Sequence, residues 1–219
     1  FGCPVEIEFA GNLGGPSGPT FSPLQVRPFV SSGRRESVRI TDEEISRAFC
    51  TTDRALGNGV WSDLRDLIFV RRHSFDRTRT RAIAEEIGVL NQELAAQRRK
   101  YVLLGFGRWG SSDPWLGIGV TWSQISEVGV LIEAGLEDFQ VDPSQGTHFF
   151  QNITSLGVAY LSVPWRAPQS RIEWDWLETR PCKGSSEHVV HLRFDSPLEV
   201  RVDGRSGRAV LLHDSDSMA

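Results

Sequence analysis

A long amphipathic helix between two apolar strands restricts the fold of this chain more than any other feature. Over residues 78–98 the apolar residues recur with the period of a helix that buries one face, at Ile83, Ile87, Leu90 and Leu94. The preceding residues 66–70 (DLIFV) and the following residues 100–106 (KYVLLGF) have the composition of buried strands. This β–α–β order predicts the α/β class.

The residues that follow continue the alternation of strands and helices, and the last part of the chain is predicted to contain strands. We expect a strand at 129–135, a helix at 148–157 that stops at Gly157, and a strand at 158–163. Strands are then expected at 188–194, 198–202 and 208–212, with a tight turn over 203–207. The α/β domain is therefore placed at residues 45–213, followed by a flexible tail at 214–219.

The N-terminal residues 1–30 are predicted to form a separate β-hairpin. Residues 5–10 alternate apolar and acidic side chains, residues 11–23 are rich in Gly, Pro and Ser and predict turn and loop, and residues 24–29 predict a second short strand. A polar linker and a short helix follow at 31–44, where Thr41 and Glu44 have the spacing of a capping box.

Composition excludes several classes of protein. The net charge is −4 and the arginine clusters alternate with acids, which gives no indication of a nucleic-acid partner. The sequence contains no run of 18 apolar residues, so no membrane-spanning helix is predicted. Three widely spaced cysteines (Cys3, Cys50 and Cys182) predict reduced thiols in a cytoplasmic protein. The N-terminus lacks a signal peptide and a starting Met, so we expect it to be the edge of a longer chain.

Glu8 on the first hairpin strand, and Gln25 and Arg27 on the second, are the candidate ligands of the N-terminal part. Pattern alone allows them to be ordinary outward-facing strand residues. Carboxylate and amide oxygens suit Mg²⁺, and a guanidinium suits a triphosphate. The two segments VEIEFA and FSPLQVRPF resemble the end of the ATP-grasp domain in the phosphoenolpyruvate synthase and pyruvate phosphate dikinase family. The resemblance implies Glu8 and Gln25 as metal ligands, Arg27 as a phosphate contact, and Mg²⁺ and ATP as cofactors.

The segment DPSQGTH, which ends at His148, resembles the phosphohistidine loop of the same family, Gly-Gly-x-Thr-x-His-Ala-Ala. Leu-Gly-Val follows at the family's spacing, and VRVDGRSGRAVLL is similar to the family's closing strand pair. The resemblance implies a swivelling β/β/α-type phosphohistidine domain in which His148 accepts the phosphoryl group. The chain departs from the family in lacking one glycine, in placing Thr147 next to His148, and in having Phe149 and Phe150 where small residues normally stand.

Elementary chemistry is consistent with that role. An imidazole at the start of a helix lies beside free backbone N–H groups, which keep it neutral and stabilise an attached phosphoryl group. Thr147, Ser144 and Gly146 are the expected phosphate contacts around His148.

The loop GFGRWGSSDPWLG is the other candidate segment. It is not a Walker loop, and it is either a packed Gly/Trp-rich connection or a second part of the site. In the second case Arg108, Ser111 and Ser112 hold a phosphoryl or carboxylate group, and Asp113 orients the imidazole. If the strands before it and before the His148 loop are neighbours, both loops leave the sheet at one edge.

The resemblance therefore implies a fragment of a phosphoenolpyruvate synthase-like phosphotransferase, in which a phosphoryl group passes from ATP through a histidine to an acceptor such as pyruvate. Its partners are the ATP-grasp domain of the same chain and the small-molecule acceptor, with no nucleic acid and no membrane; a homodimer is left open. The fragment alone is not expected to turn over. Two alternatives stay open: a non-catalytic swivel-like module for regulation or assembly, and an anion- or small-molecule-binding domain that uses Arg108 and the His148 loop without phosphoryl transfer.

Overall fold

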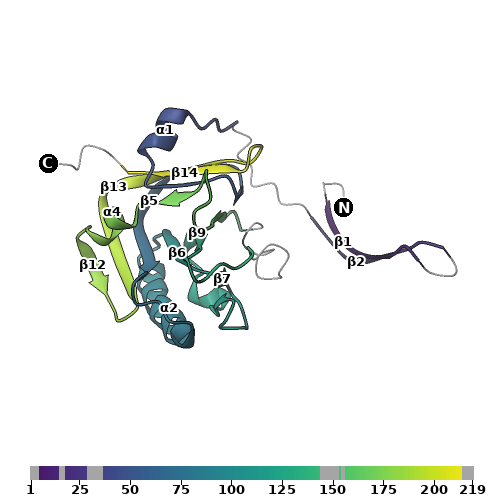
Figure 1. Ribbon diagram of the computed structural model, residues 1–219, viewed down its shortest axis with the longest axis horizontal. Helices are drawn as coiled ribbons and strands as arrows, with labels where there is room; N and C mark the ends of the chain where they lie inside the picture. Colours follow the sequence, from purple (N-terminus) through teal and green to yellow (C-terminus); the bar gives the residue numbers. More distant parts are fainter. Residues whose placement is uncertain (1–4, 15–17, 29–36, 144–152, 154–155, 214–219) are drawn as a thin grey trace. The chain divides into compact units, whose positions relative to one another are not determined.

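The computed structural model describes residues 5–14, 18–28, 37–143, 153 and 156–213. The chain divides into two compact units, residues 1–33 and 34–219 (Figure 1). The predicted tail at 214–219 lies outside the described residues.

The smaller unit is an antiparallel hairpin of β1 (Val5–Asn12) and β2 (Thr20–Pro28). Both strands extend into the Gly/Pro/Ser-rich stretch for which the sequence predicted only turn and loop. The rings of Phe9 and Phe21 contact each other across the strands in a tilted arrangement, with 4.6 Å between their centroids, and this contact stabilises the extension. On the face that carries them, Ile7, Phe9, Phe21 and Val26 are 40–62% exposed.

The larger unit contains most of the secondary structure. Its elements are α1 (Asp42–Arg47), β3 (Cys50–Thr52), β4 (Ala55–Leu56), β5 (Gly59–Val70), η1 (Arg77–Arg79), α2 (Thr80–Ala96), β6 (Tyr101–Phe106), β7 (Arg108–Trp109), β8 (Gly117–Ile118), η2 (Trp122–Gln124), β9 (Val128–Ala134), β10 (Ala159–Val163), β11 (Arg171–Ile172), α4 (Trp174–Glu178), β12 (Cys182–Ser185), β13 (Val189–Asp203) and β14 (Arg208–Leu212). The α/β class is therefore confirmed.

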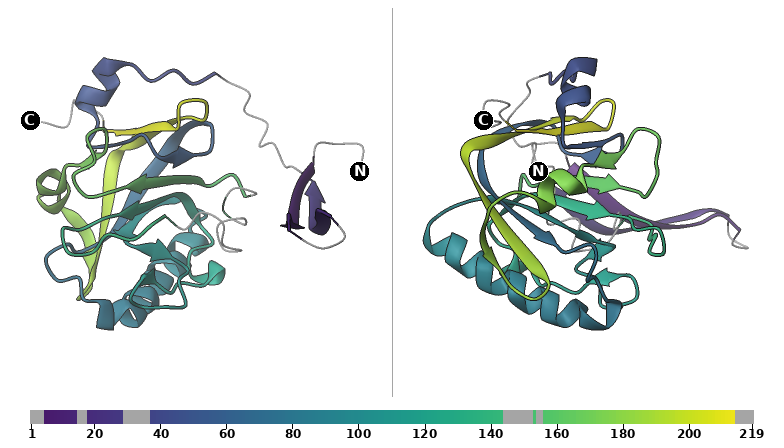
Figure 2. Two further views of the ribbon diagram at one scale, coloured as in Figure 1. Left: turned by 45° about the vertical axis from the view of Figure 1, so that its right-hand side comes forward. Right: turned by 60° about the vertical axis from the view of Figure 1, so that its left-hand side comes forward.

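One mixed sheet forms the body of this unit, in the order β11-β3-β14-β13-β5-β6-β9-β10-β4, with β12 added beside β13. Strands β5, β6, β9 and β10 are parallel, and the remaining pairs are antiparallel. Residues 50–56 contribute the second strand from one end of this order and the last strand at the other end, because β3 pairs with β14 while β4 pairs with β10. The sheet therefore curls until it returns to the same stretch of chain (Figure 2).

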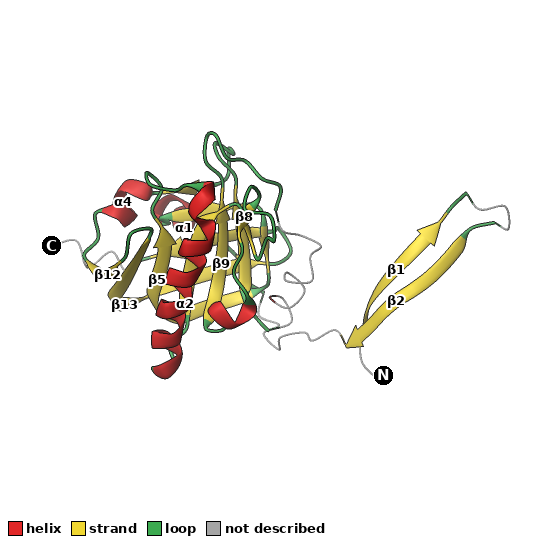
Figure 3. Ribbon diagram, turned by 90° about the horizontal axis from the view of Figure 1, so that it is seen from below, coloured by secondary structure: helices red, strands yellow, loops and turns green. Residues whose placement is uncertain are grey.

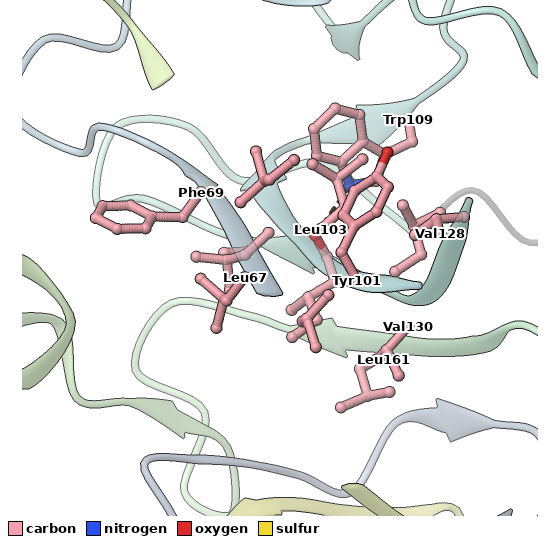
Figure 4. Close-up of a cluster of buried hydrophobic side chains, with 14 of the residues drawn as sticks. Leu67, Phe69, Tyr101, Leu103, Trp109, Val128, Val130 and Leu161 are labelled. Atoms are coloured by element: carbon pink, nitrogen blue, oxygen red, sulfur yellow. Dashed lines mark hydrogen bonds between the residues drawn. The ribbon is translucent and has the colours of Figure 1, made fainter. Parts of the chain in front are cut away.

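Helix α2 covers one face of the parallel strands (Figure 3). Ile83, Ile87 and Leu94 are buried and Leu90 is partly buried against the same core, which confirms the predicted stripe. The core is one continuous apolar cluster that includes Leu67, Leu103, Val130 and Leu161 of the four parallel strands (Figure 4). In the described residues no helix is long and apolar enough to cross a membrane.

A further prediction about local structure was wrong. Strand β13 runs through the Asp-Ser-Pro sequence at which the sequence predicted a break between two strands. The pairing with β5 shifts register between Arg193 and Leu198, and a proline is tolerated at such an irregularity because no ladder hydrogen bond is required from it there.

The short helix α1 has the capping box that the sequence predicted. The Glu44 amide donates to the Thr41 hydroxyl at 3.2 Å, and the Thr41 amide donates to the Glu44 carboxylate at 2.7 Å. Glu44 also forms an ion pair with Arg201 of β13 at 3.1 Å. These contacts attach the helix, which the sequence analysis assigned to the linker, to the larger unit.

A buried carboxylate, Asp66 of β5, joins the N-terminal edge of the parallel strands to the end of α2. One of its oxygens accepts from Arg99 at 2.6 Å, and the other accepts from Arg193 at 2.8 Å and lies 2.8 Å from the ring Nε2 of His191. Burial alone would raise the pKa of Asp66, but the hydrogen bonds from His191, Arg193 and Arg99 outweigh it and lower the pKa to about 2. Asp66 is therefore an ionised residue that joins these segments at the N-terminal edge of the parallel strands.

Candidate functional site

The C-terminal ends of β6, β9 and β10 meet at one edge of the sheet. The strands are consecutive parallel neighbours, with Phe106 beside Ala134 and Ala134 beside Val163. The strands before the two candidate loops are therefore neighbours, as the sequence prediction required. The loop after β6 and the segment after β9 start at the same edge. Loops at this edge are where α/β domains carry their binding and catalytic groups.

Glycine shapes the loop after β6. Gly107 has a φ of +68°, and an added Cβ would lie 2.6 Å from the Leu116 carbonyl oxygen and from the Phe139 ring. The close approach allows the short strands β7 and β8 to pair in parallel. Trp109 of β7 is buried, with 2% of its surface exposed. This part of the loop is therefore a packed Gly/Trp-rich connection, which is one of the two interpretations that the sequence allowed.

Glu133 of β9 fixes this loop from beneath. The Trp109 backbone N–H donates to Oε1 of Glu133 at 2.9 Å, and the Tyr160 hydroxyl donates to Oε2 at 2.5 Å. The Trp109 indole donates in addition to the Ile132 carbonyl at 2.9 Å. Glu133 is only 5% exposed, so it acts as a buried support for the loop and not as a carboxylate open to a ligand.

Arg108 connects the two loops of the site. Its Nε donates to the backbone carbonyl of Asp142 at 2.8 Å. Within the part of the chain that the structure describes, no carboxylate lies within 4.0 Å of its guanidinium. Asp142 stands two residues before Ser144. The expected site residues Ser144, Gly146, Thr147 and His148 lie outside the described residues.

Arg77, which the sequence analysis did not select, lies at the same edge. Its Nη2 donates to the Asp138 carbonyl at 2.7 Å, and its guanidinium lies over the rings of Phe139 and Trp115 at 4.7 and 5.8 Å. Among the described residues it also lacks a carboxylate within 4.0 Å. No local pattern could have revealed it, because its hydrogen-bond partner is 61 residues away in the chain.

The polar residues of the loop after β6 divide into two kinds. The Ser111 hydroxyl donates to the Asp113 carbonyl at 2.8 Å, and the Asp113 carboxylate accepts from the Trp115 amide at 2.9 Å, so both side chains take part in their own turn. Ser112 is exposed, and its hydroxyl bonds to no described residue. Trp115 is also open to solvent, with 60% of its surface exposed.

The candidate metal ligands of the hairpin face one another. Glu8 and Gln25 are directly paired across β1 and β2, and both are exposed. Arg27 is paired with Glu6, two positions further along. Among the described residues no group of three His, Cys, Asp or Glu side chains is arranged to hold a metal ion.

Comparison of the chain with protein-family models, with curated proteins and with solved structures found no match.

Proposed function

We propose that residues 34–219 form a swivelling phosphohistidine-type domain of a phosphoenolpyruvate synthase-like phosphotransferase. His148 takes a phosphoryl group from ATP and passes it to an acceptor such as pyruvate. The ATP-grasp domain that binds the nucleotide belongs to the same polypeptide, and the present chain contains only its last hairpin. The proposal places the enzyme in the cytoplasm, in keeping with the free thiols of Cys50 and Cys182.

One contact carries this proposal: the hydrogen bond from Arg108 to the carbonyl of Asp142. It fixes a guanidinium without a carboxylate partner among the described residues to the segment that leads to His148. A planar guanidinium matches two phosphoryl oxygens at once. It also stabilises a charge that is spread over the equatorial oxygens during phosphoryl transfer.

Two displacements make up the proposed reaction. In the first, a ring nitrogen of neutral His148 attacks a phosphorus of ATP, a P–N bond forms, and the P–O bond to the rest of the nucleotide breaks with its electron pair on the leaving oxygen. In the second, an acceptor oxygen attacks the same phosphorus and the P–N bond breaks. Arg108 and the exposed Ser112 are the described residues that we assign to the phosphoryl oxygens, beside Thr147, Ser144 and Gly146.

The hairpin contributes to the nucleotide site in this proposal. Glu8 and Gln25 are directly opposite and exposed, so their oxygens fit part of the coordination shell of Mg²⁺, and Arg27 contacts a phosphate. A bound Mg²⁺ neutralises charge on the triphosphate.

The test uses the full polypeptide with its ATP-grasp domain, incubated in separate reactions with ATP labelled in the β- or the γ-phosphate. We expect acid-labile, alkali-stable label that His148→Ala removes and that the matched change His73→Ala, at an exposed histidine, leaves in place. Arg108→Ala is expected to slow labelling by about 10²-fold or more. The absence of label in the unaltered protein, or its persistence in His148→Ala, refutes the proposal.

A second candidate is an anion-binding domain without phosphoryl transfer. Arg77 and Arg108 favour it, since both guanidinium groups at this edge lack a carboxylate partner within the described chain. In that case an anion such as phosphate or pyruvate raises the melting temperature of the unaltered protein and of His148→Ala but not of Arg108→Ala. If no label appears and no anion has an effect, a non-catalytic swivel-like module remains.

A further inference from the structure

A cavity of about 270 Å³ lies elsewhere in the larger unit, and none of its lining residues belongs to the loops around Arg108. Its walls come from the start of α1, from β3, from the beginning of β14 and from the turn that enters β11. Pockets for drug-sized ligands usually measure about 300–1,000 Å³, so this volume suits a smaller molecule.

The Thr51 hydroxyl lines the cavity and has no hydrogen-bond partner among the described residues. Thr51 is paired with Val210 on one side and with Arg171 on the other, so the three residues line one face of the sheet. Thr51 is only 3% exposed, and its hydroxyl forms no hydrogen bond with any residue that the structure describes. Because this hydroxyl opens into the cavity, it can donate a hydrogen bond to a polar group of a bound molecule or accept one from it.

Charged side chains of both signs line the same cavity. Arg208 and Asp53 come directly before and after the paired residues Ala209 and Thr52, on adjacent strands. No ion pair joins them within 4.0 Å, and Arg208 lacks any carboxylate partner in the described ranges. The Asp53 carboxylate is held through one oxygen by the Ser170 hydroxyl at 3.2 Å, which leaves the other oxygen available. Asp42 of α1 adds a second carboxylate to the wall.

The roof of the cavity is fixed in place. Nη2 of Arg171 donates to the carbonyls of Ile45, Ser46 and Ala48 at 2.8–3.2 Å, and so ties the end of α1 to the sheet. This use of Arg171 leaves Arg208 as the guanidinium that is available to a ligand. Ile45 and Val210 supply apolar surface to the same space.

We propose that this cavity binds a small zwitterion of the size of an amino acid, whose carboxylate pairs with Arg208 and whose ammonium pairs with Asp53 and Asp42. The Thr51 hydroxyl completes the polar contacts, and Ile45 and Val210 contact the aliphatic part. The site is independent of His148 and of the phosphoryl relay.

Isothermal titration calorimetry and thermal unfolding with each of the twenty amino acids test the proposal, with acetate and methylammonium as probes that carry one charge each. We expect at least one amino acid to bind with a Kd below about 1 mM, and the singly charged probes to bind at least about tenfold more weakly. Arg208→Gln and Asp53→Asn are each expected to weaken binding about tenfold or more. Arg205→Gln, an exposed change on the turn before β14, and His148→Ala are expected to have no effect.

Two results would overturn this inference. One is that no amino acid at about 10 mM gives heat or a shift of the melting temperature with the unaltered protein. The other is that Arg208→Gln binds the best amino acid as tightly as the unaltered protein does. Arg208 and Asp53 are both exposed, so the variants are expected to fold, and their melting without additives verifies this.

Discussion

The carboxylate of Asp66 offers the sharpest test of what holds the larger unit together. It is fully buried and accepts from two guanidinium groups, both of which are about a third exposed or less. A lowering of its pKa from 3.8 to about 2 corresponds to about 2 kcal/mol of stability. Asp66→Asn also leaves Arg99, Arg193 and His191 without their shared anion. We therefore expect the free energy of unfolding at neutral pH to fall by about 2–4 kcal/mol.

The pH dependence provides the second half of this test. A group whose pKa is lower in the folded state stabilises the fold above its unfolded pKa, and that contribution disappears as the pH falls through the folded value. The unaltered protein should therefore lose the Asp66 contribution between about pH 4 and pH 2, while Asp66→Asn should lack this part of the decline.

Denaturant unfolding followed by tryptophan fluorescence measures both effects, because all seven tryptophans lie in the larger unit. Asp63→Asn is the matched control, since Asp63 is exposed on the same strand, and it should change stability by less than about 0.5 kcal/mol. Equal stabilities of the two variants at neutral pH, or parallel pH profiles of Asp66→Asn and the unaltered protein, would refute the reasoning.

Two further outcomes follow from the geometry. Gly107→Ala places a methyl group 2.6 Å from the Leu116 carbonyl in a backbone of positive φ, and should lower the free energy of unfolding by about 2–4 kcal/mol. The control is Gly184→Ala, where no atom lies within 4 Å of the added methyl group. It should lower the free energy of unfolding by less than about 0.5 kcal/mol in the same denaturant assay. Burial raises the pKa of the Cys50 thiol to about 12. Iodoacetamide at about pH 8 should therefore label the exposed Cys182 in the folded protein, and should label Cys50 only after denaturation. Peptide mapping that finds Cys50 labelled in the native state would contradict this expectation.

Elements whose signal is local were predictable from the sequence. The apolar stripe of α2, the apolar runs of β6 and β9, and the tight turn before β14 all depend on residues close together in the chain. The two-residue strands β4, β7 and β8 were not predictable, because partners elsewhere in the fold create them. The continuity of β13 was missed for the same reason, since its long pairing with β5 overrides a sequence that is typical of a turn.

The candidate site shows the same division. Arg108 was identified because it stands in a conspicuous Gly-rich loop next to a buried strand. Arg77 was missed because it acts through the backbone carbonyl of Asp138 and two aromatic rings from other segments. The network around Asp66 was also missed, since four residues from three separate parts of the chain create it.

The return of the curled sheet to residues 50–56 has a consequence for how this chain reaches its native state. Those residues pair with β14, more than 150 positions later, and with β10, about 105 positions later. Bringing such distant segments together carries a large entropic cost before any pairing energy is gained. We expect closure to be a late and slow event during refolding, and removal of β14 to leave a molecule that cannot complete it.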